Sequence, residues 1–288
     1  MYTIIGKQNL TATIRRLDIK AEALVARLKP GHFVAIMLDP ASRPMPYNIF
    51  EVDWRRKCLS IIFEENDALT RRMAALRIND TIHRVAGPYG MPLAVEKKGT
   101  IVCVGEGIAV AALLMPARAL KQAGNKVIGI SGFASRKTSL FESQLRLNCH
   151  QFHVMYQDGM HDRKGDVMIP FGKVMAAEQV ACVYADVAPG TLAAVRVAAA
   201  AKGIPVVVNL MGFLDTYQAF YQDHSFFMGG RRYFPAVEGI FVDAQAFDIK
   251  EAVRVVTSTR EYVACRKKEL ASSPRQGVFA RLKKLFWA

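Results

Sequence analysis

The chain has 288 residues, of which 51% are hydrophobic, and it carries a formal net charge of +14. This length is sufficient for two domains with buried cores, and the apolar content excludes a disordered chain. The most apolar run, residues 108–117, is too short for a membrane-spanning helix, which needs about 18 apolar residues.

The N-terminal residues and the cysteines bear on the compartment. The stretch MYTIIGKQNL lacks a charged start followed by an apolar core, so we expect no signal peptide. The cysteines lie far apart and form neither a CxxC motif nor a metal-ligand spacing; they are Cys58, Cys103, Cys149, Cys182 and Cys265. We therefore expect buried, reduced thiols in a cytoplasmic protein.

The excess of basic residues favours anionic partners. Part of it lies in the last residues of the chain, at Arg266, Lys267, Lys268, Arg275, Arg281, Lys283 and Lys284. The sequence has no nucleic-acid-binding signature, so we expect no nucleic-acid partner. The segment 277–288 is a short amphipathic helix in pattern, and we expect this basic tail to dock on a partner protein, with an anionic membrane surface as the alternative.

Residues 1–97 have the pattern of a small antiparallel β-barrel. Short stretches of alternating hydrophobicity are separated by turn signals such as Pro30-Gly31. One helix is predicted over 67–80, with Asp67 as its N-cap.

Residues 98–210 alternate between strand and helix patterns, which predicts a doubly wound parallel sheet. The predicted helix after the first strand is closed by Gly124, and a later one by Gly203. Beyond Leu210 the period weakens, and residues 250–271 look helical again. We therefore divide the chain into 1–97, 98–210, an irregular segment 211–249, and C-terminal helices with a basic tail over 250–288.

The order of local motifs resembles one family. The motifs are PGHFVAIML, PYNIFEVD, AGPYGMPL, VCVGEGIAVAALLMPARALKQAGNKVIGISGF, QDGMHDRKGDV and VEGIFVDAQAFDIKE. Together they resemble the small flavin subunit of NADH-dependent ferredoxin:NADP oxidoreductase and the dihydroorotate dehydrogenase electron-transfer subunit, within the ferredoxin–NADP reductase superfamily. The resemblance implies an FAD-binding barrel, an NAD-binding α/β domain, a C-terminal 2Fe–2S cluster and a larger flavoprotein partner related to the glutamate synthase small subunit.

The resemblance places the FAD site on the barrel, with altered residues. The candidate residues are Arg43, Pro46, Tyr47, Asn48, Ile49, Thr70 and Gly87. The family's Gly-x-Ser-Thr helix start, which binds the pyrophosphate, is replaced by residues 66–70, where Asp67 would repel a phosphate and serves equally well as an N-cap. The residues leave the retention of FAD open.

The resemblance places the NAD loop at Gly105 and Gly107. The family has glycine where this chain has Glu106 and Ala109, and glycine is needed there because the backbone approaches the phosphates closely. A glutamate beside a pyrophosphate is costly unless it is paired. We therefore expect no NAD(P)H oxidation.

The cluster segment lacks its ligands. The family's three cysteine positions fall on about Tyr221, His224 and Ala236, so we expect no iron–sulfur cluster. We expect no other metal either, although Asp215, Asp223 and His224 contain oxygen and nitrogen donors. Aromatic residues of this segment are expected to fill the volume of the cluster or to face a partner.

Three functional interpretations follow. In the first, the chain is an electron-transfer or structural subunit of a flavin-based oxidoreductase complex, with FAD possible in the barrel. In the second, it is a cofactor-free scaffold that holds other redox subunits together. In the third, which the altered glycine loop opposes, it is an NAD(P)H reductase that acts alone. No catalytic residue is assigned, because the sequence has no nucleophile elbow, zinc-protease helix or Walker loop.

Overall fold

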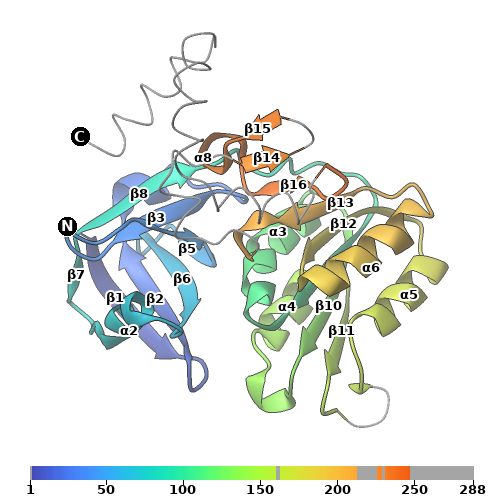
Figure 1. Ribbon diagram of the computed structural model, residues 1–288, viewed down its shortest axis with the longest axis horizontal. Helices are drawn as coiled ribbons and strands as arrows, with labels where there is room; N and C mark the ends of the chain where they lie inside the picture. Colours follow the sequence, from blue (N-terminus) through green and yellow to red (C-terminus); the bar gives the residue numbers. More distant parts are fainter. Residues whose placement is uncertain (1, 160–162, 213–225, 229–230, 247–288) are drawn as a thin grey trace.

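The computed structural model describes residues 2–159, 163–212, 226–228 and 231–246, which form a β-rich part and an α/β part side by side (Figure 1). Both the predicted barrel and the predicted doubly wound sheet are present. The tail over 250–288, with its predicted helices, lies outside the described residues.

The β-rich part consists of two antiparallel sheets. The first has the order β5-β6-β2-β1-β7 and the second the order β4-β3-β8. The strands are β1 (Tyr2–Asn9), β2 (Ile14–Lys20), β3 (Phe33–Met37), β4 (Met45–Asn48), β5 (Glu51–Asp53), β6 (Cys58–Glu64), β7 (Thr81–Ile82) and β8 (Arg84–Tyr89). Alternating apolar residues from both sheets, among them Ile4, Leu17, Ile36 and Leu59, meet in one buried cluster.

Two helices accompany these strands: α1 (Glu22–Val25) and α2 (Ala68–Ala75). Helix α2 begins after Asp67, as the sequence predicts, and buries Met73 against the barrel. The predicted helix was longer, but the structure ends it at Ala75, with extended backbone at Leu76.

The α/β part is built on one sheet of order β11-β10-β9-β12-β13-β16. Its elements are β9 (Thr100–Glu106), the short turn η1 (Gly107–Ala109), α3 (Val110–Gln122), β10 (Lys126–Phe133), η2 (Arg136–Thr138), α4 (Glu142–Asn148), β11 (Gln151–Tyr156), α5 (Met168–Ala177), β12 (Val180–Asp186), α6 (Pro189–Ala200), β13 (Val206–Asn209), η4 (Leu210–Gly212) and β16 (Phe241–Asp243). Helices α3 and α4 cover one face of the sheet, and α5 and α6 cover the other (Figure 1).

Two elements of the α/β part were not predicted. Helix α5 contains Pro170 and Gly172, which argue against a helix in a sequence pattern, but Pro170 lies in the first turn, where its missing N–H needs no helical partner. Strand β16 lies in the irregular segment and pairs antiparallel with β13, so the sheet is mixed. The same segment supplies a small hairpin of β14 (Phe226–Met228) and β15 (Arg231–Tyr233), followed by α8 (Pro235–Glu238).

The two parts share buried side chains. Phe50 of the barrel packs in one cluster with Val110 and Leu114 of α3. Phe33 of β3 packs in another cluster with residues of the parallel sheet, including Val102 and Val183. These contacts place the end of β4 against the carboxyl edge of the sheet.

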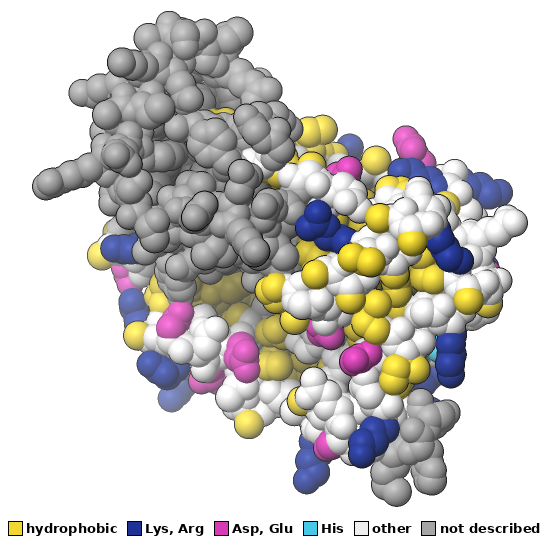
Figure 2. Space-filling model, turned by 45° about the vertical axis from the view of Figure 1, so that its right-hand side comes forward, with side chains coloured by type: hydrophobic (Ala, Val, Ile, Leu, Met, Phe, Trp, Pro, Cys, Tyr) yellow, Lys and Arg dark blue, Asp and Glu magenta, His cyan; other side chains and the backbone are white. Residues whose placement is uncertain are grey.

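Helices α5 and α6 expose an apolar surface, which comes forward in Figure 2. We call the exposed side chains Ile169, Ala176, Ala177, Ala193, Ala194, Val197, Ala200 and Ala201 the α5–α6 face. Val197 is 73% exposed and Ile169 is 47% exposed. The exposed lysines Lys173 and Lys202 border this face. Within the described parts of the chain, no helix has the length and apolarity to span a membrane.

Candidate functional site

A cavity of about 160 Å³ lies where the barrel meets the carboxyl edge of the parallel sheet. Its walls come from β4, β6, η1, α3, the end of β12 and η4. The lining residues are Asn48, Phe50, Ile62, Ile108, Ala109, Ala111, Ala112, Asp186 and Met211. The cavity is therefore mainly apolar, with polar groups from Asn48 and Asp186.

A short polar chain forms one side of this cavity. The Asn209 amide Nδ2 donates to Asp186 Oδ2 at 2.8 Å and to Asn48 Oδ1 at 3.3 Å. Burial raises the pKa of Asp186 to about 8, although the hydrogen bond from Asn209 opposes this shift. Asp186 therefore carries its proton at neutral pH and is a neutral hydrogen-bonding group.

The predicted FAD residues on β4 have different surroundings. Pro46 and Ile49 are buried, and Arg43 is exposed before the strand. The half-buried Tyr47 donates its hydroxyl to Met73 Sδ at 3.1 Å and contacts Phe63 edge-on. Of the predicted set, Asn48 is the residue that lines the cavity.

The start of α2, where the resemblance places the FAD pyrophosphate, is occupied by the chain's own groups. Asp67 Oδ1 accepts a hydrogen bond from the Thr70 backbone N–H at 2.7 Å, and Thr70 Oγ1 accepts one from the Asp67 backbone N–H at 3.0 Å. This reciprocal pair is a capping box. The predicted site residue Thr70 therefore has a structural role at this helix end.

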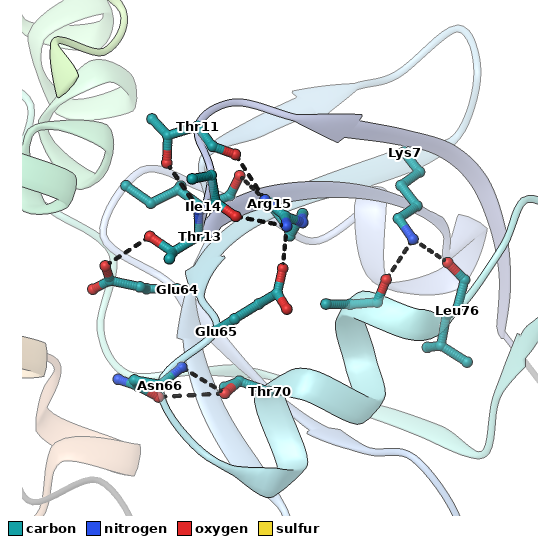
Figure 3. A network of polar contacts seen from close by, with 12 residues as sticks. Lys7, Thr11, Thr13, Ile14, Arg15, Glu64, Glu65, Asn66, Thr70 and Leu76 are labelled. Carbon is teal, nitrogen blue, oxygen red and sulfur yellow. Dashed lines mark hydrogen bonds and ion pairs between the residues drawn. The ribbon is translucent and has the colours of Figure 1, made fainter. Parts of the chain in front are cut away.

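Two further carboxylates stand next to this helix start (Figure 3). Glu64 accepts a hydrogen bond from the Thr13 hydroxyl at 3.1 Å, and Glu65 forms an ion pair with Arg15. Their carboxylates are turned toward Thr13 and Arg15, and it is Asp67 that places a negative charge at the backbone donors that a pyrophosphate would use. The Asp67 carboxylate does not fit the pyrophosphate of FAD at this helix start.

Gly87, another predicted FAD residue, lies within β8 rather than in a turn. Its φ is +141°, and a Cβ at this position would come within 3.2 Å of the Phe33 carbonyl oxygen. Its own carbonyl accepts a hydrogen bond from Arg27 at 3.3 Å. Glycine is therefore required here for the path of the strand along β3.

The predicted NAD loop lies at a topological switch point of the sheet. From β9 the chain passes through β10 to β11 on one side and then returns to β12 on the other, so the carboxyl ends of β9 and β12 adjoin. Open α/β sheets bind their ligands in the crevice at such a point. Gly105 ends the shared ladder opposite Asp186, and a Cβ at Gly105 would come within 2.9 Å of Leu113.

Glu106 spans this crevice. Its Oε2 accepts a hydrogen bond from the Ala188 backbone N–H at 2.8 Å, and its Oε1 accepts one from the Thr191 hydroxyl at 3.1 Å. Both donors belong to the N-terminus of α6. The sequence identified Glu106 as a departure from the glycine pattern, but it could not indicate this partner, since the two groups are 82 residues apart.

Part of the predicted cluster segment lies outside the described residues, including Asp215, Tyr221, Asp223 and His224. The third position, Ala236, is buried in α8. The four cysteines of the described chain, Cys58, Cys103, Cys149 and Cys182, are buried free thiols, and burial raises the pKa of each. Among the described residues, no group of three His, Cys, Asp or Glu side chains could hold a metal ion.

Comparisons with known proteins agree with the resemblance read from the motifs. No family model matches the chain. It is 28% identical over 170 residues to a dihydroorotate dehydrogenase B (NAD⁺) electron transfer subunit of Streptococcus thermophilus, covering 57% of this chain and 65% of that protein. It is 26% identical over 201 residues to the Enterococcus faecalis protein of that name, covering 68% and 76% of the two chains.

A protein described as uncharacterized, from the adh 3' region of Clostridium beijerinckii, is 26% identical over 172 residues. The alignments span 58% of that protein and 65% of the Streptococcus thermophilus subunit, which is less than two thirds of each. Among solved structures, an NADH-dependent reduced ferredoxin–NADP oxidoreductase chain superposes with a TM-score of 0.79 at 19% identity, covering 94% of this chain and 98% of that one. This likeness, at such low identity, establishes the fold.

Proposed function

Because the chain is a relative of the ferredoxin–NADP reductase-like flavin subunits, we propose that it is a subunit of a multi-subunit flavin-based oxidoreductase complex. In this proposal its role is structural: it holds other redox subunits together and binds neither FAD, nor NAD(P)H, nor a 2Fe–2S cluster of its own. The partner class is a larger flavoprotein resembling the glutamate synthase small subunit, or another redox subunit.

The occupied N-terminus of α2 carries this proposal. Asp67 Oδ1 accepts a hydrogen bond from the Thr70 backbone N–H at this helix start. A phosphate about 5 Å from one carboxylate would be repelled by about 3 kcal/mol at an effective dielectric constant of 20. A doubly charged pyrophosphate beside the Asp67 carboxylate would need compensating cations, so this helix start disfavours the cofactor that the fold accommodates in other proteins.

The size of the junction cavity supports the same interpretation. A volume of about 160 Å³ is close to that of a cavity that holds benzene, about 150 Å³. Sites for larger ligands usually measure about 300–1,000 Å³. The cavity that the described residues line is therefore smaller than the usual site for a ligand the size of a flavin.

One observation favours a second candidate, an electron-transfer subunit that retains FAD. The Asn48 amide and the Asp186 carboxyl both line the cavity, and such groups can hydrogen-bond the edge of a planar ring. In this candidate Arg43, Pro46, Tyr47, Asn48, Ile49, Thr70 and Gly87 surround the flavin. The flavin would supply electron transfer when bound, while Asn48 would orient its ring.

The α5–α6 face provides a surface for the partner subunit. Large exposed apolar patches on soluble proteins mark interaction sites, and small side chains allow another backbone to approach closely. Lys173 and Lys202 border the patch, so we propose a partner surface of small apolar residues flanked by carboxylates.

The experiment is purification of the tagged full chain from its own cells, with the flavin and iron of the co-purified subunits measured. Val197→Asp puts a charge in the centre of the α5–α6 face, and Leu147→Asp is the matched control on α4, where the side chain is 76% exposed. We expect Val197→Asp to lose at least about tenfold in retained redox subunits, because burying an unpaired charge is costly, and Leu147→Asp to retain them.

A chain that purifies from its own cells without any flavin- or iron-containing subunit would contradict the structural role. Equal retention by the two variants would contradict the assignment of the α5–α6 face. Circular dichroism spectra matching the wild type would confirm that both variants are folded.

A further inference from the structure

We infer that Glu106 acts as an internal substitute for a nucleotide phosphate and thereby fills the anion position at the switch point of the sheet. The inference deepens the proposed absence of NAD(P)H binding, on which it rests. It names Glu106 as a determinant of that exclusion, in addition to the methyl group of Ala109.

The strand order of the sheet brings Glu106 to this point. It is the last residue of β9, and the neighbouring Gly105 is paired with Asp186 at the end of β12. Helix α6 follows β12 directly, so its N-terminus lies across the crevice from the end of β9. The Glu106 side chain needs only to cross this crevice to reach Ala188 and Thr191.

The N-terminus of α6 is a favourable place for a negative charge. The helix has 12 residues and no acidic residue in its first turn, and its N-cap is Ala188, which has no side-chain acceptor. The first backbone N–H groups of a helix lack partners within the helix and carry partial positive charge. A carboxylate from a distant strand therefore accepts from the N-cap backbone N–H, a role that a Glu or Gln within the helix fills in a capping box.

Two glycines indicate that room for a ligand remains beside this contact. Gly107 lies on the β9 side of the crevice and Gly190 in the first turn of α6. A Cβ built at either glycine meets no atom within 4 Å. The backbone is therefore open on both sides of the carboxylate, and the Glu106 side chain is the described group that fills the anion position itself.

The experiment measures binding of ADP and inorganic pyrophosphate to the full chain by calorimetry. Glu106→Ala removes the carboxylate. Glu106→Gln keeps a side-chain oxygen for the Ala188 N–H and removes the charge, so it remains informative where the alanine variant is unstable. Glu96→Gln is the control for net charge, because Glu96 is exposed and does not reach the crevice in the described contacts.

We expect Glu106→Ala to bind ADP at least about tenfold more tightly than the wild type, because a like charge is removed and helix donors are freed. Glu106→Gln should gain a smaller factor. Glu96→Gln should bind as the wild type does, which separates this site from binding to the basic surface in general. A folded Glu106→Ala or Glu106→Gln protein that binds ADP no more tightly than Glu96→Gln would overturn the inference.

The ADP measurements test the role of Glu106 separately from the proposed structural role of the chain. Detection of FAD in the purified chain would contradict the structural role but would leave the ADP measurements to decide the role of Glu106. Tight ADP binding by the wild type, equal to that of Glu106→Ala, would contradict both the inference and the proposed exclusion of NAD(P)H.

Discussion

At the scale of single residues, the junction contains a buried acid that costs the protein stability. Asp186 is 3% exposed, and its pKa is raised from 3.8 to about 8. Between these two values the folded protein holds a proton that the unfolded chain releases. The free energy of unfolding therefore falls as the pH rises through this window.

Replacing Asp186 with Asn should remove this dependence, since the amide oxygen can still accept from Asn209. We expect the wild type to lose up to about 1.4 kcal/mol of unfolding free energy per pH unit between pH 4 and pH 8 relative to Asp186→Asn. Urea denaturation at a series of pH values measures the difference. Parallel pH profiles for the two proteins would show that Asp186 is not a buried neutral acid, and Asp158→Asn, at an exposed aspartate, is the control.

Contacts between residues close together in the chain could be predicted from the sequence, whereas contacts between distant residues could not. The role of Asp67 as an N-cap could be predicted because its partner, Thr70, is three residues away. The electrostatic repulsion between Glu106 and a phosphate could be predicted from the sequence. The hydrogen-bond partners of Glu106 on α6 could not be predicted, because only the order of strands in the sheet brings them near. The binding roles assigned to the candidate FAD, NAD and cluster residues stay predictions.

At the scale of elements, α2 is held at both ends by side chains (Figure 3). Asp67 caps its N-terminus, and Lys7 of β1 reaches the carbonyls of Ala74 and Leu76 at its C-terminus, the latter at 2.8 Å. Negative charge at the start of a helix and positive charge at its end both stabilise the helix dipole. Helix α2 is therefore stable without an anion bound at its N-terminus.

Asp67→Ala should lower the free energy of unfolding by about 1 kcal/mol, because it leaves the Thr70 N–H without its acceptor. Asp67→Asn should cost only a few tenths of a kcal/mol, since asparagine is an equally good N-cap residue. Chemical denaturation of both variants checks the pair. A neutral Asp67→Ala variant would contradict the structural role that we assign to this carboxylate.

Elements with a strong local pattern could be predicted, and those that depend on their surroundings could not. The strands and helices from β9 to β11 and from β12 to β13 follow clear periodicity. Helix α5 was missed because Pro170 and Gly172 interrupt its pattern. Strand β16 has three residues, and its partner β13 is more than thirty residues away in the chain, so only the assembled sheet identifies it.

At the scale of the whole molecule, we propose that the chain keeps the fold of a flavin subunit without binding its cofactors. The barrel and the doubly wound sheet could be predicted from strand order and the resemblance. The hydrogen bonds between the barrel and the sheet could not be predicted, because Asn48, Asp186 and Asn209 come from three separate strands. At the positions where the resemblance places phosphates, the carboxylates of Asp67 and Glu106 accept hydrogen bonds from the chain's own backbone.

The measurement that tests this account most directly is the FAD content of the full chain after purification, incubation with excess FAD and removal of unbound cofactor. The visible spectrum and the fluorescence of flavin released on denaturation give the amount per chain, and circular dichroism confirms that the protein is folded. We expect a folded, colourless protein. A protein that retains close to one FAD per chain would contradict the structural role and would establish the barrel as a working flavin site.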